Sequence, residues 1–355
     1  MLEMNRAWNA NYFTYIKAYI GIIYLYMLRI GNRRKYAFET FRNKTIIECL
    51  KPEEVLILGG RADYYACRAN NYQFVWIGGV VAAIIVATRD GHILPLKLQI
   101  SLARKRFEAS KRYFLLYEDQ LPVGIFFAIF ANEYSHISIC IAHGVPSTEE
   151  LILDGFLCKY HLLYQLDHKD DLRPDSIYFE LGPPFDIEWG DDVSSTIILV
   201  GTGLQALMPT FYRKSLDCYR QIRNILEDLG WNVVYRPHPS ERAHNFASHF
   251  SAVDTSSKVS CLSGSKKLFI GYQSTLIYEA KAFGHTVVTL GDPDVGKLKR
   301  FTPDKEIAAT SVESIKDSLS ELHAESKKRP HQRLRPLRDR FLPILREIEA
   351  CNECE

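Results

Sequence analysis

Two stretches in the second half of the chain decide the expected fold: NVVYRPHP at residues 232–239 and LFIGYQSTLIYEAKAFG at residues 268–284. Each begins with a short apolar run, typical of a buried strand, and then breaks into a polar loop or a helix. The prolines on both sides of His238 fix the backbone and remove two donors, so the first strand cannot continue beyond this point. Both stretches therefore predict the strand-and-loop units of a parallel α/β sheet.

The same alternation of short apolar runs and helix-compatible segments extends over most of the chain. Further strands are expected in EEVLILGG (53–60), YQFVWIGG (72–79), KRYFLLYEDQ (111–120), HISICIAHGVP (136–146), CKYHLLYQLD (158–167), TIILVGTG (196–203) and TVVTLG (286–291). VVAAIIVAT (80–88) is compatible with a strand or a buried helix. The segment 183–194 has linker composition, with two prolines, a glycine and acids but no periodicity. We therefore predict two Rossmann-like α/β domains with mainly parallel sheets that face a central cleft.

The expected domain limits follow from these segments. Residues 41–185 form the first sheet domain, expected to bind an acceptor, and residues 195–330 form the second, expected to bind a donor. Residues 1–40 hold an N-terminal helix, and residues 331–355 form a charged helical tail.

Composition excludes several classes of protein. The chain has 355 residues, of which 47% are hydrophobic and 24% charged, and its formal net charge is +2. Because positive and negative charges nearly balance, the sequence does not predict binding to nucleic acid. The eight cysteines lie mostly in apolar runs, which favours a reducing compartment and thus the cytoplasm. CNEC at 351–354 has metal-ligand spacing, but no second Cys or His pair lies near it to complete a zinc site.

The N-terminal helix is rich in Tyr and Ile and is followed by a cluster of basic residues. Only 11 residues separate Lys17 from Arg29, too few for the apolar stretch to span a bilayer. No small-residue cleavage site follows, so no signal peptide is predicted. Two interpretations stay open: a helix that lies on the inner face of the cell membrane, and a helix packed on its own domain.

Three loops of the second domain combine features that suit a phosphate. A glycine turn, a rigid His and Arg pair, and hydroxyls at a helix N-terminus all follow predicted strands. We also expect an acid one helical turn after the hydroxyls to accept hydrogen bonds from a ribose. The candidate residues are Gly201, Thr202, Gly203, Arg236, His238, Pro239, Ser274, Thr275 and Glu279.

RPHP followed by GYQSTLIYEAKAFG resembles the HP and Ser-Ser/Thr motifs of bacterial GT-B glycosyltransferases, above all sialyltransferases and Kdo transferases that use CMP-sugars. The resemblance covers roughly residues 197–291. It implies that His238 contacts the donor phosphate and assists the departure of CMP, and that Ser274 and Thr275 bind the same phosphate. It also implies that no metal is needed, and Asp292 and Asp294 of GDPD are read as a turn. Teichoic acid glycerophosphotransferases carry similar signatures.

The catalytic base is expected in the first domain. Sialyltransferases of this kind carry an Asp-Asp-Gly or Asp-Glu-Gly motif there, whereas this chain has YEDQLP, without the glycine. Asp119 is the first candidate and Glu118 the second. His143 of AHGVPS resembles the histidine of an HG motif in the glycerophosphotransferases. Arg61 and Asp63 in GGRADY are candidates for binding the acceptor.

The sequence therefore predicts a metal-independent, membrane-associated glycosyltransferase that takes a nucleotide-sugar donor, with CMP favoured, and a glycan or lipid-linked acceptor of a bacterial surface polysaccharide. Three alternatives stay open: a CDP-glycerol or CDP-ribitol phosphotransferase, a transferase for UDP- or GDP-sugars, and a scaffold subunit that binds a nucleotide-sugar without catalysis.

Overall fold

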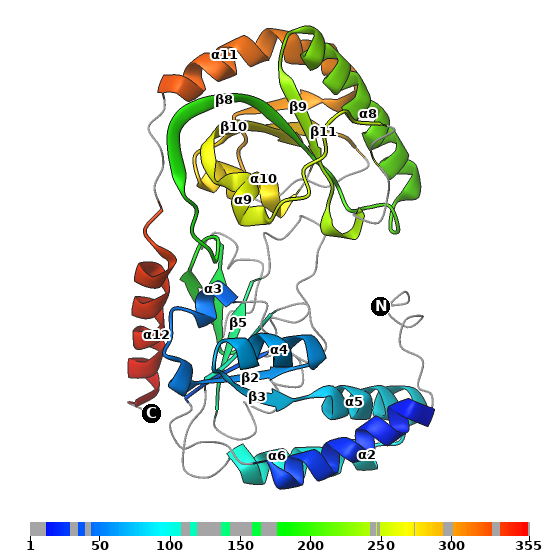
Figure 1. The fold of residues 1–355 in the computed structure, drawn as a ribbon, viewed down its shortest axis with the longest axis vertical. Helices are drawn as coiled ribbons and strands as arrows, with labels where there is room; N and C mark the ends of the chain where they lie inside the picture. The colour runs from blue at the N-terminus through cyan, green and yellow to red at the C-terminus, as the bar shows by residue number, and fades with distance from the viewer. Residues whose placement is uncertain are drawn as a thin grey trace. The chain divides into compact units, whose positions relative to one another are not determined.

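The structure is a computed structural model and describes residues 12–28, 35–39, 44–107, 114–118, 136–142, 158–164, 176–241, 246, 249–272, 274–293, 301–328 and 334–353. The chain forms two compact units (Figure 1). Unit 1 comprises residues 1–143, 152–184 and 337–355, and unit 2 comprises residues 144–151 and 185–336.

Unit 1 contains a parallel sheet of seven strands in the order β3-β2-β1-β4-β5-β6-β7. The strands are β1 (Tyr36–Glu39), β2 (Val55–Gly59), β3 (Gln73–Trp76), β4 (Phe114–Glu118), β5 (Ile137–Ile141), β6 (Tyr160–Leu163) and β7 (Ile177–Glu180). Every residue of β2 and β5 is buried, as the continuous apolar runs predict for strands covered on both faces.

Helices cover both faces of this sheet. The helices are α2 (Tyr12–Met27), α3 (Lys44–Ile47), α4 (Arg61–Ala69), α5 (Gly78–Asp90), α6 (Leu94–Phe107) and α12 (Leu337–Glu353), with a 3₁₀ turn, η1, at Pro52–Glu54. α2, α5 and α6 pack on the face that carries Leu56 and Leu58. α3 and α12 pack on the opposite face, which carries Val55 and Ile57. The C-terminal helix is therefore part of the core of unit 1.

Unit 2 contains a parallel sheet of five strands in the order β12-β11-β10-β8-β9. The strands are β8 (Trp189–Val200), β9 (Asn232–Arg236), β10 (Gly264–Gly271), β11 (Thr286–Gly291) and β12 (Lys305–Ala308). The helices are α8 (Pro209–Asp228), α9 (Lys258–Leu262), α10 (Thr275–Ala282) and α11 (Ile315–Lys328), with 3₁₀ turns η4 (Pro239–Glu241) and η5 (Ala309–Ser314). Because β8 begins at Trp189, the second half of the expected linker belongs to a strand.

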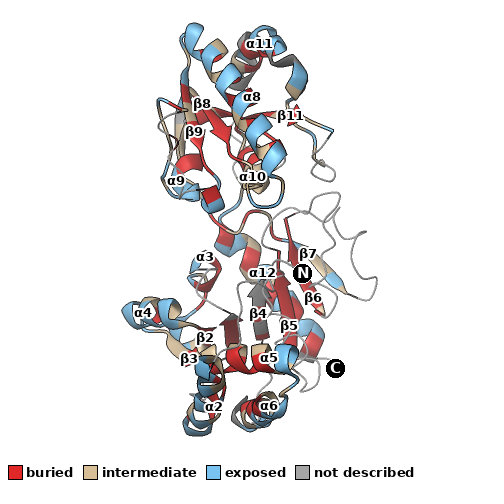
Figure 2. Ribbon diagram, turned by 90° about the vertical axis from the view of Figure 1, so that its right-hand side faces the viewer, coloured by how far each residue is buried: buried red, intermediate tan, exposed pale blue. Residues whose placement is uncertain are grey.

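The alternation of side chains along β8 separates two layers of core. Ile197 and Leu199 pack with α8 and α11, whereas Ile198 and Val200 pack with α9 and α10. Figure 2 shows the strands as the most buried elements of this unit. The ambiguous run at residues 80–88 is helical, because it lies in α5 and packs its Val80, Ala83 and Val86 inward.

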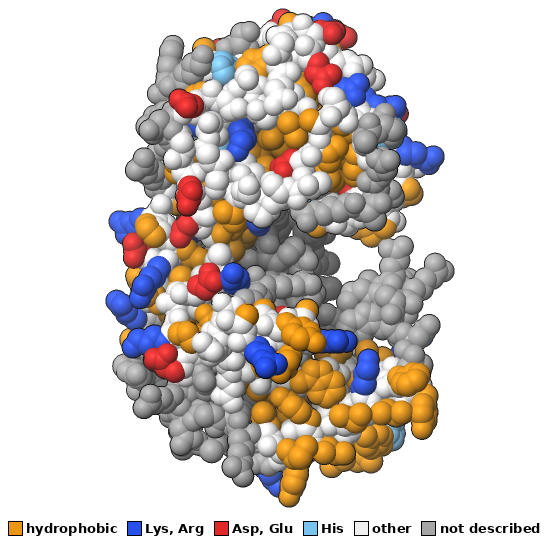
Figure 3. Space-filling model, viewed as in Figure 1, with side chains coloured by type: hydrophobic (Ala, Val, Ile, Leu, Met, Phe, Trp, Pro, Cys, Tyr) orange, Lys and Arg blue, Asp and Glu red, His pale blue; other side chains and the backbone are white. Residues whose placement is uncertain are grey.

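α2 packs within unit 1 and still exposes much of its apolar surface. Ala18, Gly21 and Leu25 are buried, but Phe13 and Met27 are 69% and 68% exposed. Figure 3 shows hydrophobic side chains gathered over this helix at the lower right. In the described part of the chain, no helix has the length and apolar character needed to cross a membrane.

Candidate functional site

The three loops singled out in the sequence lie together at one edge of the sheet in unit 2. β8 pairs with both β10 and β9, and Val200 is in register with Gly271 on one side and with Arg236 on the other. The three strands therefore end level, and the loops that follow begin side by side. Ligands of open parallel sheets bind outside this carboxyl edge.

Glu241 holds two of these loops in one arrangement. Its side chain is fully buried. One carboxylate oxygen, Oε1, accepts a hydrogen bond from the backbone N–H of Gly203 at 2.7 Å. The other, Oε2, accepts from the backbone N–H of His238 at 3.0 Å and from the hydroxyl of Tyr235 at 2.9 Å. Sequence reasoning missed Glu241, although an acid three residues after the histidine in RPHPSE was visible.

His238 lies directly over Gly203. A Cβ atom added at Gly203 would come within 2.4 Å of Nδ1 of the His238 ring, and the glycine has φ of +70°. Only glycine satisfies both the close approach and the left-handed backbone. The ring itself is at an exposed position at the end of β9.

The neighbours of His238 set which ring nitrogen donates. Its Nδ1 accepts a hydrogen bond from the backbone N–H of Ser240 at 3.2 Å and lies 2.8 Å from the Ser240 hydroxyl. Because a backbone N–H can only donate, the neutral ring carries its hydrogen on Nε2. His238 can therefore offer an Nε2–H to an anion.

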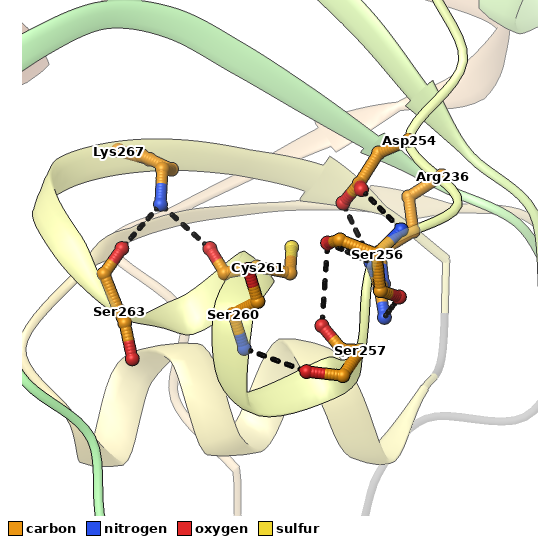
Figure 4. Close-up of polar contacts among 8 residues, drawn as sticks. All are labelled: Arg236, Asp254, Ser256, Ser257, Ser260, Cys261, Ser263 and Lys267. Atoms are coloured by element: carbon orange, nitrogen blue, oxygen red, sulfur yellow. Dashed lines mark hydrogen bonds and ion pairs between the residues drawn. The ribbon is translucent and has the colours of Figure 1, made fainter.

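Arg236 is engaged within the protein (Figure 4). Its guanidinium pairs with Asp254 at 2.5 Å and donates to the backbone oxygen of Ser256 at 3.2 Å, and the residue is 6% exposed. Burial raises the pKa of the Asp254 carboxyl, but hydrogen bonds from Ser256 and the charge of Arg236 outweigh burial and lower that pKa overall. The Arg236 charge is thus balanced by Asp254, and this pair holds the segment after β9 against the strand.

The start of α10 has the predicted geometry. Ser274 is the N-cap, and its hydroxyl oxygen accepts from the backbone N–H of Leu276 at 3.3 Å. Thr275 is the first helical residue. The first backbone N–H groups of α10 therefore point out of the carboxyl edge of the sheet, where the helix dipole favours an anion.

Glu279 lies one turn farther along the same helix. Its side chain is fully buried, and its Oε1 is 2.7 Å from Nζ of Lys258 on α9. The ribose contact stays a prediction, and the structure places this carboxylate in an ion pair between α9 and α10.

In unit 1, Arg61 and Asp63 follow the end of β2, as predicted. Asp63 accepts a hydrogen bond from the backbone N–H of Gly60 at 2.8 Å and thereby caps α4. The guanidinium carbon of Arg61 lies 5.9 Å from the ring centre of Tyr65. These contacts explain how the helix begins, and acceptor binding by the two residues stays a prediction.

Only one of the three candidate bases belongs to the described residues. Glu118 is the last residue of β4. Asp119 and His143 lie outside the described residues, as does Asp294 of the GDPD segment. Among the residues that the structure describes, no group of three His, Cys, Asp or Glu side chains is arranged to hold a metal ion.

No protein-family model matches the sequence, and no curated protein matches it. Solved structures do match over most of the chain. UDP-GlcNAc 2-epimerase from Neisseria meningitidis, bound to UDP-GlcNAc, is 10% identical with a TM-score of 0.56 over 89% of this chain and 100% of its own. An S. aureus MnaA–UDP structure is 10% identical with a TM-score of 0.54 over 89% of this chain and 96% of its own. MurG from Acinetobacter baumannii is 10% identical with a TM-score of 0.53 over 89% of this chain and 99% of its own.

These similarities concern the fold. They confirm the prediction of an α/β protein with parallel sheets and a GT-B-like architecture. At this level of identity they assign the chain to no specific family.

Proposed function

We propose that the chain is an enzyme that uses a nucleotide-sugar, and that it transfers the sugar to an acceptor. The observation that carries the proposal is the level ending of β8, β9 and β10, which gathers a glycine turn, His238 and the N-terminus of α10 at one edge of the sheet. Together these groups supply hydrogen-bond donors and a helix dipole at one place.

In the proposed reaction the acceptor hydroxyl oxygen attacks the anomeric carbon of the sugar. The bond from that carbon to the phosphate oxygen breaks, and the electron pair leaves with the nucleotide. The Nε2–H of His238 and the first N–H groups of α10 stabilise the charge that develops on the leaving phosphate. The acceptor proton passes to a general base, for which Asp119, Glu118 and His143 are the candidates.

The donor nucleotide is a separate question. The HP and Ser-Thr motifs favour a CMP-sugar, with a nonulosonate or Kdo as the sugar. The structures with a similar fold favour UDP, because the Neisseria epimerase is described with UDP-GlcNAc and MnaA with UDP. We propose a glycan or lipid-linked glycan as the acceptor, in bacterial capsule or lipopolysaccharide synthesis at the inner face of the cell membrane.

A second candidate function is epimerisation of a nucleotide-sugar. It is favoured by the fold similarity to UDP-GlcNAc 2-epimerases, which extends over nearly the whole chain. The two functions differ in their products, because a transferase releases the nucleotide whereas an epimerase returns it still attached to a sugar.

A thermal-shift series with CMP, CDP, UDP and GDP tests the shared premise. A nucleotide that binds only the folded protein at about 100 times its Kd adds about 2.7 kcal/mol to the free energy of unfolding, a clear rise in Tm. We expect the rise to be lost in His238→Ala and kept in His249→Ala, a histidine away from the strand ends.

The identity of the stabilising nucleotide separates the candidates. CMP supports the CMP-sugar transferase, CDP supports the phosphotransferase, and UDP or GDP changes the donor class. Incubation with the matching nucleotide-sugar, followed by separation of the products, then distinguishes nucleotide release from epimerisation. If no nucleotide raises Tm, the assignment of this edge as a nucleotide site is wrong.

A further inference from the structure

α2 is apolar around its whole circumference, although only one side of it is buried. Of its 16 residues, YFTYIKAYIGIIYLYM, only Lys17 is charged. The exposed fraction is 77% for Tyr12, 58% for Ile23 and 66% for Tyr26. The exposed large hydrophobic side chains of this helix and of the adjacent start of α6 are Tyr12, Phe13, Ile16, Tyr19, Ile20, Ile23, Tyr26, Met27, Ile93, Leu94 and Leu98. We call this set the α2 face.

The α2 face cannot turn inward, because α2 is fixed on its other side. It crosses α5 where Gly21 meets Gly79, and a Cβ atom added at Gly79 would lie 2.4 Å from Cα of Gly21. Buried Gln99 of α6 donates from Nε2 to the backbone oxygens of Ala18 at 2.7 Å and of Gly79 at 3.0 Å. Three helices thus hold one another, and the remaining apolar surface of α2 is not covered by any element of unit 1 that the structure describes.

The charge around the α2 face is mainly positive. The described cations of α2, α5 and α6 are Lys17, Arg89, Lys97, Arg104 and Lys105. Their one acid, Asp90, accepts a hydrogen bond from the hydroxyl of Tyr15 at 2.6 Å. In the sequence, α2 is followed at once by Arg29, Arg33, Arg34 and Lys35.

An aromatic cavity adjoins the α2 face. It has a volume of about 390 Å³ and is lined by Tyr24, Tyr64, Arg68, Tyr72, Phe74 and Trp76. Tyr24 belongs to α2, one residue after Ile23 of the α2 face, and its hydroxyl accepts from the backbone N–H of Trp76 at 3.0 Å. The cavity and the α2 face are therefore built on the same helix, and Arg68 gives the otherwise apolar cavity a cation.

We propose that the α2 face and the adjoining aromatic cavity form a docking surface for a bilayer of anionic phospholipids. The apolar side chains enter the boundary between headgroups and acyl chains, while the basic residues of α2, α5 and α6 attract the phosphates. Tyr12, Tyr19 and Tyr26 recur every seventh residue on the exposed side, and Tyr is a residue that prefers the membrane interface. The cavity holds an acyl chain, and Arg68 attracts the phosphate of the same lipid.

A second copy of this chain is a poorer occupant. A symmetric dimer would set the same mainly cationic surface against itself, so that the cations of one copy would face those of the other. An anionic lipid surface compensates these charges.

The docking surface concerns one part of the proposed function, namely how the enzyme reaches a lipid-linked acceptor at the membrane. It does not rest on the nucleotide site, because vesicle binding requires no donor. Failure of vesicle binding and failure of nucleotide binding are therefore separate results.

Vesicle co-sedimentation tests the docking surface. We expect the full chain to sediment with vesicles that contain phosphatidylglycerol, to bind phosphatidylcholine vesicles far more weakly, and to be released by salt. Ile23→Ser/Tyr26→Ser should weaken binding about tenfold or more. The control is Leu207→Ser/Leu229→Ser, which changes two hydrophobic residues of unit 2 with similar exposure, 69% and 52%, and should bind as the wild type does.

Sedimentation velocity of the lipid-free protein distinguishes the other occupants. A dimer that Ile23→Ser/Tyr26→Ser breaks would overturn the proposal in favour of a contact between copies. Absence of binding to anionic vesicles, with the protein folded, would also overturn it.

Quenching by brominated acyl chains tests the cavity. In a Trp8→Phe background the remaining tryptophans are Trp76 of the cavity and Trp189 and Trp231 of unit 2. We expect vesicles of brominated phosphatidylglycerol to quench part of the emission, and Trp76→Phe to abolish that quenching. Intact vesicle binding without quenching of Trp76 would overturn the assignment of the cavity to the docking surface.

Discussion

The carboxylate of Glu241 lies 2.7 Å from the backbone nitrogen of Gly203, across two loops that are 38 residues apart in sequence. The same carboxylate also accepts from the His238 backbone and the Tyr235 hydroxyl. These three hydrogen-bond donors lie at the edge of the sheet that also carries the residues expected to bind phosphate. We propose that Glu241 acts as a positioning residue that fixes the Gly203 and His238 loops against each other.

Replacing Glu241 by Gln should disturb both loops. The amide has the same size, but its NH₂ group would face at least one of the three donors. A buried donor left without an acceptor costs about 1–3 kcal/mol, so we expect a loss of that order in the free energy of unfolding and weaker stabilisation by nucleotide. Urea unfolding and the thermal-shift series measure the two effects. Glu313→Gln, an exposed acid with 82% side-chain exposure, is the control and should change neither. Unchanged stability and nucleotide response in Glu241→Gln would contradict a positioning role.

Comparing two glycines with the same backbone conformation separates the cost of backbone strain from the cost of a steric clash with His238. Gly203 and Gly230 have φ of +70° and +83°, but a Cβ atom at Gly203 would meet the His238 ring whereas one at Gly230 would meet nothing within 4 Å. Each change to Ala should cost about 1–2 kcal/mol for the left-handed backbone. Only Gly203→Ala should also displace His238 and lose the rise in Tm caused by nucleotide. Equal nucleotide responses in the two variants would show that His238 does not depend on Gly203.

The Arg236–Asp254 pair should make stability depend on pH in the acid range. The pKa of Asp254 in the folded state is lowered from its usual 3.8, so its contribution is complete above about pH 4–5 and is lost as pH falls through the folded-state value. Asp254→Asn removes this contribution and leaves Arg236 buried without its partner, so the variant should be less stable at pH 7 by a few kcal/mol. The difference between wild type and variant, measured by urea unfolding between pH 7 and pH 3, should shrink toward the acid end. A difference that is constant with pH would mean that the charge of Asp254 is not what stabilises the fold.

Because α2 and α5 cross in close contact, adding one methyl group at the crossing should lower the stability of the protein. In Gly79→Ala the new Cβ would overlap Cα of Gly21, so the helices must separate, at a cost of about 1–3 kcal/mol. Gly190→Ala is the control, because its Cβ would meet the nearest atoms at 3.4 Å, an ordinary contact. Thermal unfolding compares the two variants. If the two lose equal stability, the glycine contact does not decide how α2 packs.

Much of the fold was predictable from local pattern. Runs such as VLILG and ISICI are apolar at every position, and a strand of that composition is stable only with both faces covered, as β2 and β5 are. The start of α10 was predictable to within one residue, because Ser274 and Thr275 both offer an oxygen to free N–H groups, and its end was predictable from Gly284, which adopts φ of +84°. The three loops of the candidate site were also predictable, because strand ends are visible in the sequence.

What the loops do to one another was decided by the tertiary structure. Strand order and register bring together residues that are far apart in the chain. They pair Arg236 with Asp254, bury Glu279 against Lys258, and let Glu241 accept a hydrogen bond from Gly203. The apolar sequence of α2 alone fits a buried helix and an interfacial helix equally well. Only the packing of Gly21 on Gly79 decides which side is covered, because a helix that is apolar all round carries no pattern that distinguishes its buried side from its exposed one.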